Sequence, residues 1–199
     1  AVLSKLFMGG KAVEDAKPVI QQLEAQGVHT ILDLANEGGR ANIDQTFLSL
    51  MKLIKKAQDI DAVSGIAIKI SGLAARTTLM HWNSSEDKIE DEKNAVMTKV
   101  YRLAQQAKES RLSLYVDAEQ APIQGAIDAI TRTLMQMFNT DEIPTVFSTH
   151  QTYLKNSNNA LLRDLQWAKG AGITYGTKLV RGAYYNETLA LSPQSPLVF

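Results

Sequence analysis

The sequence has no cysteine among its 199 residues. This absence excludes disulfide scaffolds, cysteine-ligated zinc, iron–sulfur clusters and thiol catalysis. The chain also has no excess charge, because 21 Lys and Arg residues balance 21 Asp and Glu residues. It therefore gives no electrostatic reason to expect a nucleic acid partner. No apolar run approaches the roughly 18–20 residues of a membrane span, and the first ten residues lack the charged and apolar blocks of a signal peptide.

The composition is that of a globular protein, with 45% apolar and 21% charged residues. A chain of this length fits the usual size of one domain and is long enough to bury a core. It contains no low-complexity stretch, no Ser/Gly linker and no internal repeat that would mark a boundary. We therefore interpret residues 1–199 as a single domain.

Short β-rich apolar runs alternate with segments of helical periodicity along the chain. The apolar runs predict strands at residues 28–35, 62–70, 112–116, 145–149 and 174–180. The periodic segments predict helices at residues 18–26, 43–57, 87–108, 122–137 and 156–170. Ser84 and Asp87 are expected to form a capping pair for the third helix, and Gly27 and Gly170 are expected to end the first and the last.

Strands that alternate with amphipathic helices predict a parallel sheet, because a parallel pair needs a crossover long enough for a helix. Such a sheet is either doubly wound or closed as a barrel. Residues 37–40 lack the GxGxxG spacing of a dinucleotide-binding turn, and no GxxxxGK[ST] motif is present. A barrel instead places functional groups at the carboxyl ends of many strands. We therefore predict an α/β fold of the (βα)8 TIM-barrel type, with about five βα units present.

Polar residues follow each of the five predicted strands. Because the carboxyl ends of parallel strands meet at one rim of a barrel, we expect these side chains to converge on one ligand pocket. They are Asp33 and Glu37, then Lys69, then Asp117 and Glu119, then His150 and Gln151, and finally Lys178 and Arg181.

Lys69 interrupts the apolar strand GIAIKI, where a charge is costly unless it meets an anion or loses its proton. An anionic substrate group, a Schiff-base role, or a structural ion pair with Asp117 or Asp33 would each explain it. The three histidines of the chain, His150 among them, have no ligand-like spacing. We therefore predict no metal site.

Five strand-end segments follow one another in a distinctive order: ILDLANEG at 31–38, AIKISGLA at 67–74, VDAEQ at 116–120, STHQTYLK at 148–155 and KLVRGAY at 178–184. In this order they resemble the successive strand motifs of the proline dehydrogenase family, and the resemblance spans about residues 28–185. The fourth segment is more similar to the eukaryotic, mitochondrial branch than to the bacterial bifunctional one.

The resemblance implies a distorted (βα)8 barrel, of which this chain is the N-terminal and central part. It implies FAD as the cofactor, oxidation of L-proline to 1-pyrroline-5-carboxylate, and transfer of the electrons to membrane quinone. It also implies a mitochondrial location on the matrix side of the inner membrane, which is compatible with peripheral membrane association.

The resemblance further implies roles for individual residues. Lys69 would face the substrate carboxylate and Asp117 would stand close to the substrate, with Tyr184 packing nearby and Glu37 in the polar network. The cofactor-binding positions that it implies are Gln151, Lys178, Val180, Gly182, Ala183 and His150. The family pattern has tyrosine where this chain has His150.

After Tyr185 the chain continues only as NETLALSPQSPLVF, with no counterpart of the C-terminal helix whose paired arginines hold the substrate carboxylate in this family. We therefore expect the native polypeptide to be longer. Two other functions stay open. A Schiff-base (βα)8 lyase would use Lys69 or Lys178 as the nucleophile and Asp117 as the proton shuttle. A truncated, non-catalytic flavin-binding relative would explain the missing arginines.

Overall fold

A computed structural model of the chain describes residues 13–34 and 43–191, and the fold is given for these residues. They contain one five-stranded sheet in which every neighbouring pair is parallel. The strands are β1 (Thr30–Asp33), β2 (Val63–Ile68), β3 (Ser113–Val116), β4 (Val146–Gln151) and β5 (Gly176–Val180). All five predicted strands are present, and β4 extends two residues further than predicted.

One described helix precedes the first strand, and the others follow the strands along the chain. They are α2 (Val13–Glu24), α3 (Ile43–Ala57), the 3-10 turn η1 (Ile70–Gly72), α4 (Arg76–Met80), α5 (Asp87–Glu109), α6 (Ala121–Phe138), α7 (Ser157–Ala171) and α8 (Tyr185–Leu191). None of them is long and apolar enough to cross a lipid bilayer, so the part of the chain that the structure describes contains no candidate membrane span.

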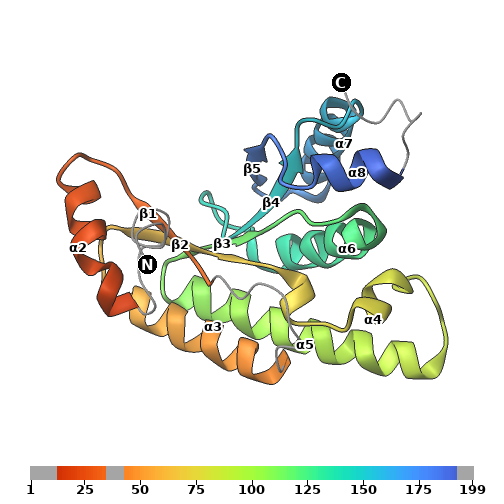
Figure 1. Cartoon of the computed structure of the whole chain (residues 1–199), viewed down its shortest axis with the longest axis horizontal. Helices are drawn as coiled ribbons and strands as arrows, with labels where there is room; N and C mark the ends of the chain where they lie inside the picture. The colour runs from red at the N-terminus through yellow and green to blue at the C-terminus, as the bar shows by residue number, and fades with distance from the viewer. Residues whose placement is uncertain (1–12, 35–42, 192–199) are drawn as a thin grey trace.

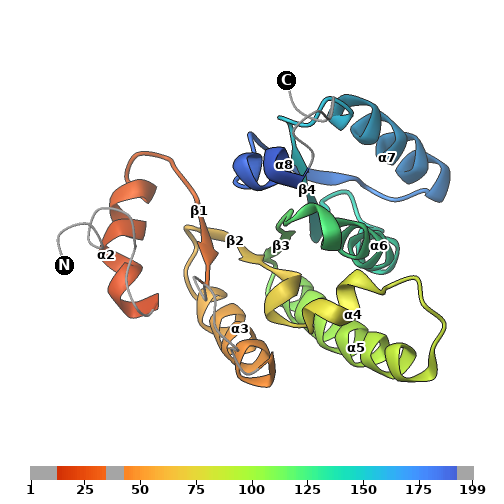
Figure 2. The same cartoon turned by 45° about the vertical axis from the view of Figure 1, so that its right-hand side comes forward.

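The strands lie in the order β1-β2-β3-β4-β5, so each new strand is added beside the one before it. A doubly wound sheet reverses this progression and carries helices on both faces, whereas a barrel keeps it and covers only the outer face. Here α3, α5, α6 and α7 lie along one side of the sheet (Figures 1 and 2). The arrangement is that of consecutive βα units of a TIM-type barrel.

Alternate strand residues build the core between the sheet and its helices. Ile66 and Ile68 of β2 and Leu114 and Val116 of β3 are at most 1% exposed and pack against the buried stripes of α3, α5 and α6. The stripe of α6 follows Pro122, which lies in the first turn, where a proline removes no helical hydrogen bond. This burial fixes which strand residues face the helices and which face away.

Two helices have boundaries that differ from the prediction, and a third lacks the predicted cap. Pro18 lies inside α2, because the helix begins at Val13 and buries Ala16 and Ile20 on one side. Helix α7 continues through Gly170, and Gly172 ends it in the left-handed conformation with φ of 67°. The predicted capping pair of α5 is wrong too, since the extended residue before that helix makes no side-chain capping bond.

Candidate active site

The face of the sheet turned away from the helices is here called the inner face. It consists of Gly65, Ala67, Lys69, Tyr115, Asp117, Phe147, Thr149, Gln151, Gly176, Lys178 and Val180. In one part of this face, two aromatic rings lie beside two glycines. The rings of Tyr115 and Phe147 are 4.6 Å apart. A Cβ atom on Gly65 or Gly176 would lie within 3 Å of the neighbouring ring. The two neighbouring rings on β3 and β4 therefore fill the space that the glycines on β2 and β5 leave open.

Lys178 and Asp117 form an ion pair on the inner face, closer to the carboxyl ends of the strands than the aromatic rings. Lys178 pairs in register with Thr149 of β4, so the ion pair crosses over β4 to the end of β3. The backbone amide of Asp117 donates to the Ile68 carbonyl at 2.9 Å, which fixes the carboxylate beside the end of β2. The structure thus brings together two of the residues predicted at the rim.

Lys69 follows β2 directly and keeps an extended backbone, with φ of −107° and ψ of 124°. Because Ile68 and Ile70 on either side are buried in the core, alternation places Lys69 on the inner face, where it is half-buried. The hypothesis that it pairs with Asp117 is wrong, since that carboxylate pairs with Lys178. Among the described side chains Lys69 makes no ion pair, so its ammonium is available to an anionic ligand.

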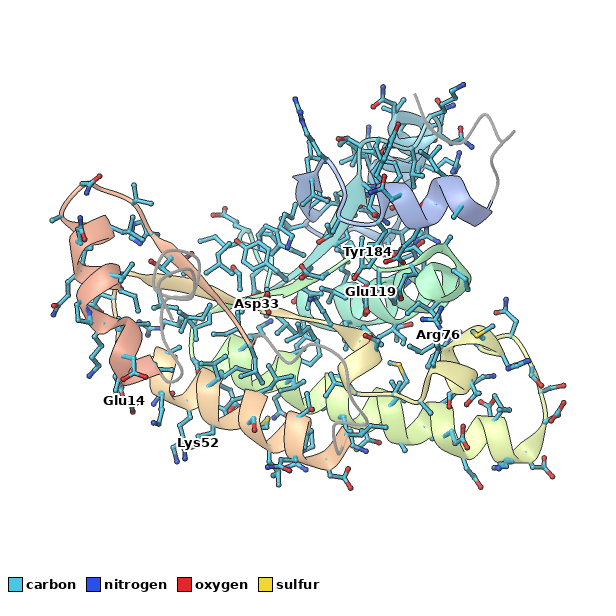
Figure 3. All side chains as sticks on the ribbon, viewed as in Figure 1. Glu14, Asp33, Lys52, Arg76, Glu119 and Tyr184 are labelled. Atoms are coloured by element: carbon cyan, nitrogen blue, oxygen red, sulfur yellow. The ribbon has the colours of Figure 1, made fainter. Side chains whose placement is uncertain are left out.

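Glu119 and Gln151 form a second polar group at the strand ends. The Glu119 side chain is buried, and its carboxylate accepts from the amide of Ser71 at 3.0 Å and from the Ser71 hydroxyl. The Gln151 side-chain amide donates to the Glu119 backbone carbonyl at 3.1 Å. The Gln151 Oε1 atom is buried, and no described group donates to it. Figure 3 shows Glu119 near the middle of the molecule.

A pocket of about 420 Å³ lies where β5 leads into α8. Gly182 has φ of 117°, and a Cβ atom there would lie 1.9 Å from the Tyr153 ring and 3.3 Å from the Gln151 Oε1 atom. The Tyr153 hydroxyl lies 2.9 Å from the Thr188 hydroxyl of α8. The pocket is lined by Thr152, Tyr153, Arg181, Gly182 and Tyr185. It therefore adjoins the unpaired oxygen of Gln151.

The remaining predicted residues are placed as follows. Val180 is half-buried and its carbonyl accepts from the Thr152 amide at 2.8 Å. Ala183 is exposed, and Tyr184 is half-buried directly before α8. Asp33 ends β1 and has an interaction partner of its own. Glu37 lies outside the described residues. No group of three or more His, Asp or Glu side chains in the described ranges is arranged to hold a metal ion.

His150 does not join the other rim residues. Its Nε2 atom lies 2.9 Å from the Tyr175 hydroxyl and 3.4 Å from Asp164 of α7. It therefore faces the helix layer, whereas the next residue, Gln151, has the opposite orientation. Burial disfavours ionisation of Asp164, but hydrogen bonds from His150 and Arg132 outweigh it and lower the pKa of this carboxyl below its usual value. Burial raises the pKa of Tyr175 to about 12, so this phenol stays protonated.

We expect Asp164→Asn to lower the free energy of unfolding by about 1–2 kcal/mol at pH 7, since His150, Arg132 and Tyr175 lose a charged acceptor. The folded pKa of Asp164 is below the ordinary value of about 3.9, so the stabilisation is complete above that pH. It is lost as the pH falls through the lower folded pKa. Urea unfolding at pH 7, 5, 4 and 3 measures the difference, which must shrink at the acidic end.

Asp141→Asn is the matched control for this prediction. Asp141 pairs with Lys108 at 2.9 Å, but its side chain is 64% exposed. Solvent screens such a pair, and its loss is expected to cost less than about 1 kcal/mol. Equal losses in the two variants would show that the Asp164 network does not contribute more than a surface ion pair.

Sequence reasoning missed Thr152, Tyr153 and Tyr185, which line the pocket beside Gln151. A signal for them was present, because all three stand inside or beside the QTYLK and RGAY segments. Glu119 was recognised as a rim residue, but its contact with Ser71 was not predicted, because that contact joins residues 48 positions apart.

Comparisons with known proteins agree with this architecture. A crystal structure of proline utilization A (PutA) from Bdellovibrio bacteriovorus, inactivated by N-propargylglycine, matches with a TM-score of 0.81 at 17% sequence identity. The match covers 98% of this chain and 22% of that chain. This similarity shows the fold and confirms the prediction of a TIM-type α/β arrangement.

Two curated relatives differ in how much of the chain they match. The carbapenem antibiotics biosynthesis protein CarD of Pectobacterium carotovorum is 29% identical over 194 residues, which cover 94% of this chain and 51% of that protein. Human proline dehydrogenase 1, mitochondrial, is 40% identical over 88 residues, which cover 44% of this chain and 14% of that protein. The chain thus spans about half the length of the first relative and a smaller share of the second.

The family model described as "Proline dehydrogenase" matches residues 16–196. The match includes all five strands of the sheet and the five strand-end segments whose residues surround the inner face. The chain belongs to the proline dehydrogenase family.

Proposed function

We propose that the protein oxidises L-proline to 1-pyrroline-5-carboxylate, with FAD as the cofactor. The observation that carries this proposal is the half-buried ammonium of Lys69, which has no ion-pair partner among the described residues and lies on the same face as the Asp117–Lys178 pair. Proline brings a carboxylate, which needs a cation, and a ring nitrogen, which loses a proton when the C=N bond forms. The inner face offers both a cation, Lys69, and a carboxylate, Asp117.

We assign the binding of the proline carboxylate to Lys69. We assign Asp117 to the ring nitrogen, because its amide bond to the Ile68 carbonyl keeps it beside the end of β2, and we propose that Tyr184 packs near the substrate. Because Asp117 already holds Lys178, its carboxylate is kept in one orientation. We also keep Glu37 as a member of this polar network, on the resemblance of its segment alone.

The residues present fit a flavin. The buried Oε1 atom of Gln151 has no donor among the described groups, and a ring N–H group of a ligand would supply one. Lys178 offers a cation on the same face, and Val180, Gly182 and Ala183 form the backbone that passes from β5 to the adjoining pocket. When bound, FAD supplies the two-electron acceptor for the hydride that leaves the proline carbon next to nitrogen. The residues of this chain would bind, orient and electrostatically tune it.

We assign His150 to the packing of β4 against α7 rather than to a direct flavin contact, because its ring is held by Tyr175 and Asp164. We further propose that residues 1–199 form a single domain, the N-terminal and central part of the barrel. The mitochondrial name of the human relative supports a mitochondrial location. Membrane quinone on the matrix side of the inner membrane is the electron acceptor that we propose, with peripheral membrane association.

The absorbance spectrum of the purified protein tests the proposal. Flavin bands that bleach when proline is added without oxygen are the expected result. Flavin bands without bleaching would favour a non-catalytic flavin-binding relative. A colourless protein in which cyanoborohydride traps a carbonyl substrate on Lys69 or Lys178 would favour a Schiff-base lyase. Either result would overturn proline oxidation as the function.

We expect Lys178→Ala to lower the midpoint potential of the bound flavin, because a cation on the inner face favours the reduced, anionic form. A charge at about 4 Å is worth roughly 4 kcal/mol at an effective dielectric constant of about 20. Asp117 offsets part of this interaction energy. If a quarter of the roughly 4 kcal/mol remains, the two-electron potential shifts by roughly 20 mV. Spectroelectrochemical titration measures the shift.

Two control variants belong to this titration. Lys178→Arg keeps the cation and is expected to keep most of the potential. Lys169→Ala removes an exposed cation at the end of α7 and is expected to leave the potential unchanged. An unchanged potential in Lys178→Ala would remove Lys178 from the flavin environment.

A further inference from the structure

Glu119 is the most deeply buried acidic side chain in the described part of the chain, at 2% exposure. A buried carboxylate is costly unless hydrogen bonds or a cation compensate its charge. None of the Lys, Arg and His side chains in the described ranges forms an ion pair with it. Its partners are instead the amide and the hydroxyl of Ser71. The charge of Glu119 is therefore used to hold one particular backbone turn.

That turn directly follows Lys69. Residues Ile70–Gly72 form η1, and the side chain of Lys69, the residue before it, makes no capping hydrogen bond. The first amides of such a turn have no acceptor within the turn. Glu119 supplies one, because its Oε1 atom accepts from the Ser71 amide at 3.0 Å. The backbone two residues after Lys69 is thus fixed to the end of β3.

The backbone of Glu119 is itself fixed from two sides. Its amide donates to the Gln124 Oε1 atom of α6 at 2.7 Å. Its carbonyl accepts from the Gln151 side chain at 3.1 Å, and this bond requires the NH₂ group of Gln151 to face Glu119. The Oε1 atom of Gln151 therefore points away from Glu119 and has no described donor. One residue thus touches both the turn after Lys69 and the side chain of Gln151.

We propose that Glu119 is a positioning residue that sets the place of Lys69 relative to the ends of β3 and β4. It acts through Ser71 and does not itself contact substrate. The inference rests on the proposed function for the identity of the anion that Lys69 binds. The contact between Glu119 and the turn does not depend on that identity, and so it can be tested separately.

Hydrogen exchange of residues 69–73 tests the contact without any activity. Glu119→Leu keeps the bulk of the side chain and removes both acceptor oxygens. We expect the Ser71 amide hydrogen to exchange at least ten times faster in this variant than in the parent protein. Glu119→Gln keeps one acceptor oxygen and is expected to restore most of the protection. Unchanged protection in Glu119→Leu would overturn the inference, whether or not the protein oxidises proline.

Steady-state kinetics of the flavin-loaded, full-length protein tests the role. We expect Glu119→Leu to raise the KM for proline about tenfold, with Glu119→Gln within threefold of the parent. The direction of the change in KM distinguishes the two effects, because removing a negative charge near an anion site would by itself lower KM. In the background of Lys69→Met, Glu119→Leu is expected to change KM less than twofold, since the group that it positions is absent.

Additive effects of the two substitutions would overturn the positioning role. Ser71→Ala keeps the test decisive if Glu119→Leu does not fold, because it removes only the hydroxyl donor and leaves the amide bond in place. It is expected to raise KM about threefold, again only when Lys69 is present. A protein that holds flavin and oxidises proline but shows no dependence on Ser71 or Glu119 would refute this inference alone.

Discussion

Gly182→Ala is expected to destabilise the protein by about 3–5 kcal/mol. Two causes act together at this position. A φ of 117° is a backbone conformation that side chains rarely adopt, which costs on the order of 1–3 kcal/mol. The new Cβ atom would also lie 1.9 Å from the ring of Tyr153. This ring is buried and its hydroxyl is bonded to Thr188, so moving it away costs further packing.

Urea unfolding followed by circular dichroism measures the loss. Gly170→Ala is the matched control, because Gly170 lies inside α7 and a Cβ atom there would meet nothing within 4 Å. That variant is expected to gain about 0.5–1 kcal/mol, since alanine is the better helix former. A loss below 1 kcal/mol in Gly182→Ala would mean that the turn after β5 does not have the conformation described.

The five strands could be predicted from the sequence because each is a short, apolar, β-rich run between segments of helical periodicity. In β2, every residue from Val63 to Ile68 except Ser64 is buried, as expected for a strand of a parallel sheet that is covered on both faces. The short elements could not be predicted. η1, α4 and α8 have three, five and seven residues, which is too few for a helical period to appear.

The strand-end position of the candidate residues was predictable, but the ion pair among them was not. Strand ends identified Lys69, Asp117 and Lys178 as neighbours, because parallel strands share one rim. The choice of ion pair depends on the register across β4, where Lys178 lies beside Thr149. No sequence pattern encodes that register, and the structure pairs Lys178 with Asp117.

The orientation of His150 could have been predicted. It lies an even number of residues after Val146, which is fully buried against the helices. Side chains two and four residues apart on a strand share a face. The predicted strand stopped at Thr149, and so the alternation was not carried to His150. The longer strand in the structure places this ring beside Asp164 and Tyr175.

Lys69→Met is expected to raise the KM for proline about 10- to 100-fold in the flavin-loaded protein. A hydrogen bond to a charged group contributes about 1.5–3 kcal/mol, and each 1.4 kcal/mol changes an affinity tenfold. Methionine keeps the length of the side chain and removes its charge. Folding is expected to be little affected, because Lys69 makes no ion pair with a described side chain that its loss would leave unpaired.

Steady-state kinetics over a range of proline concentrations measures the change, and Lys69→Arg serves as the control that keeps a cation. The split between KM and kcat decides the role, because a group that only binds the carboxylate acts equally in the ground state and the transition state. We therefore expect kcat to fall much less than KM rises. Cyanoborohydride in the presence of proline or its oxidation product is expected to trap nothing on Lys69. A covalent adduct at Lys69, or complete loss of kcat in Lys69→Met, would make this lysine a nucleophile instead, because an electrostatic anchor forms no bond to the substrate.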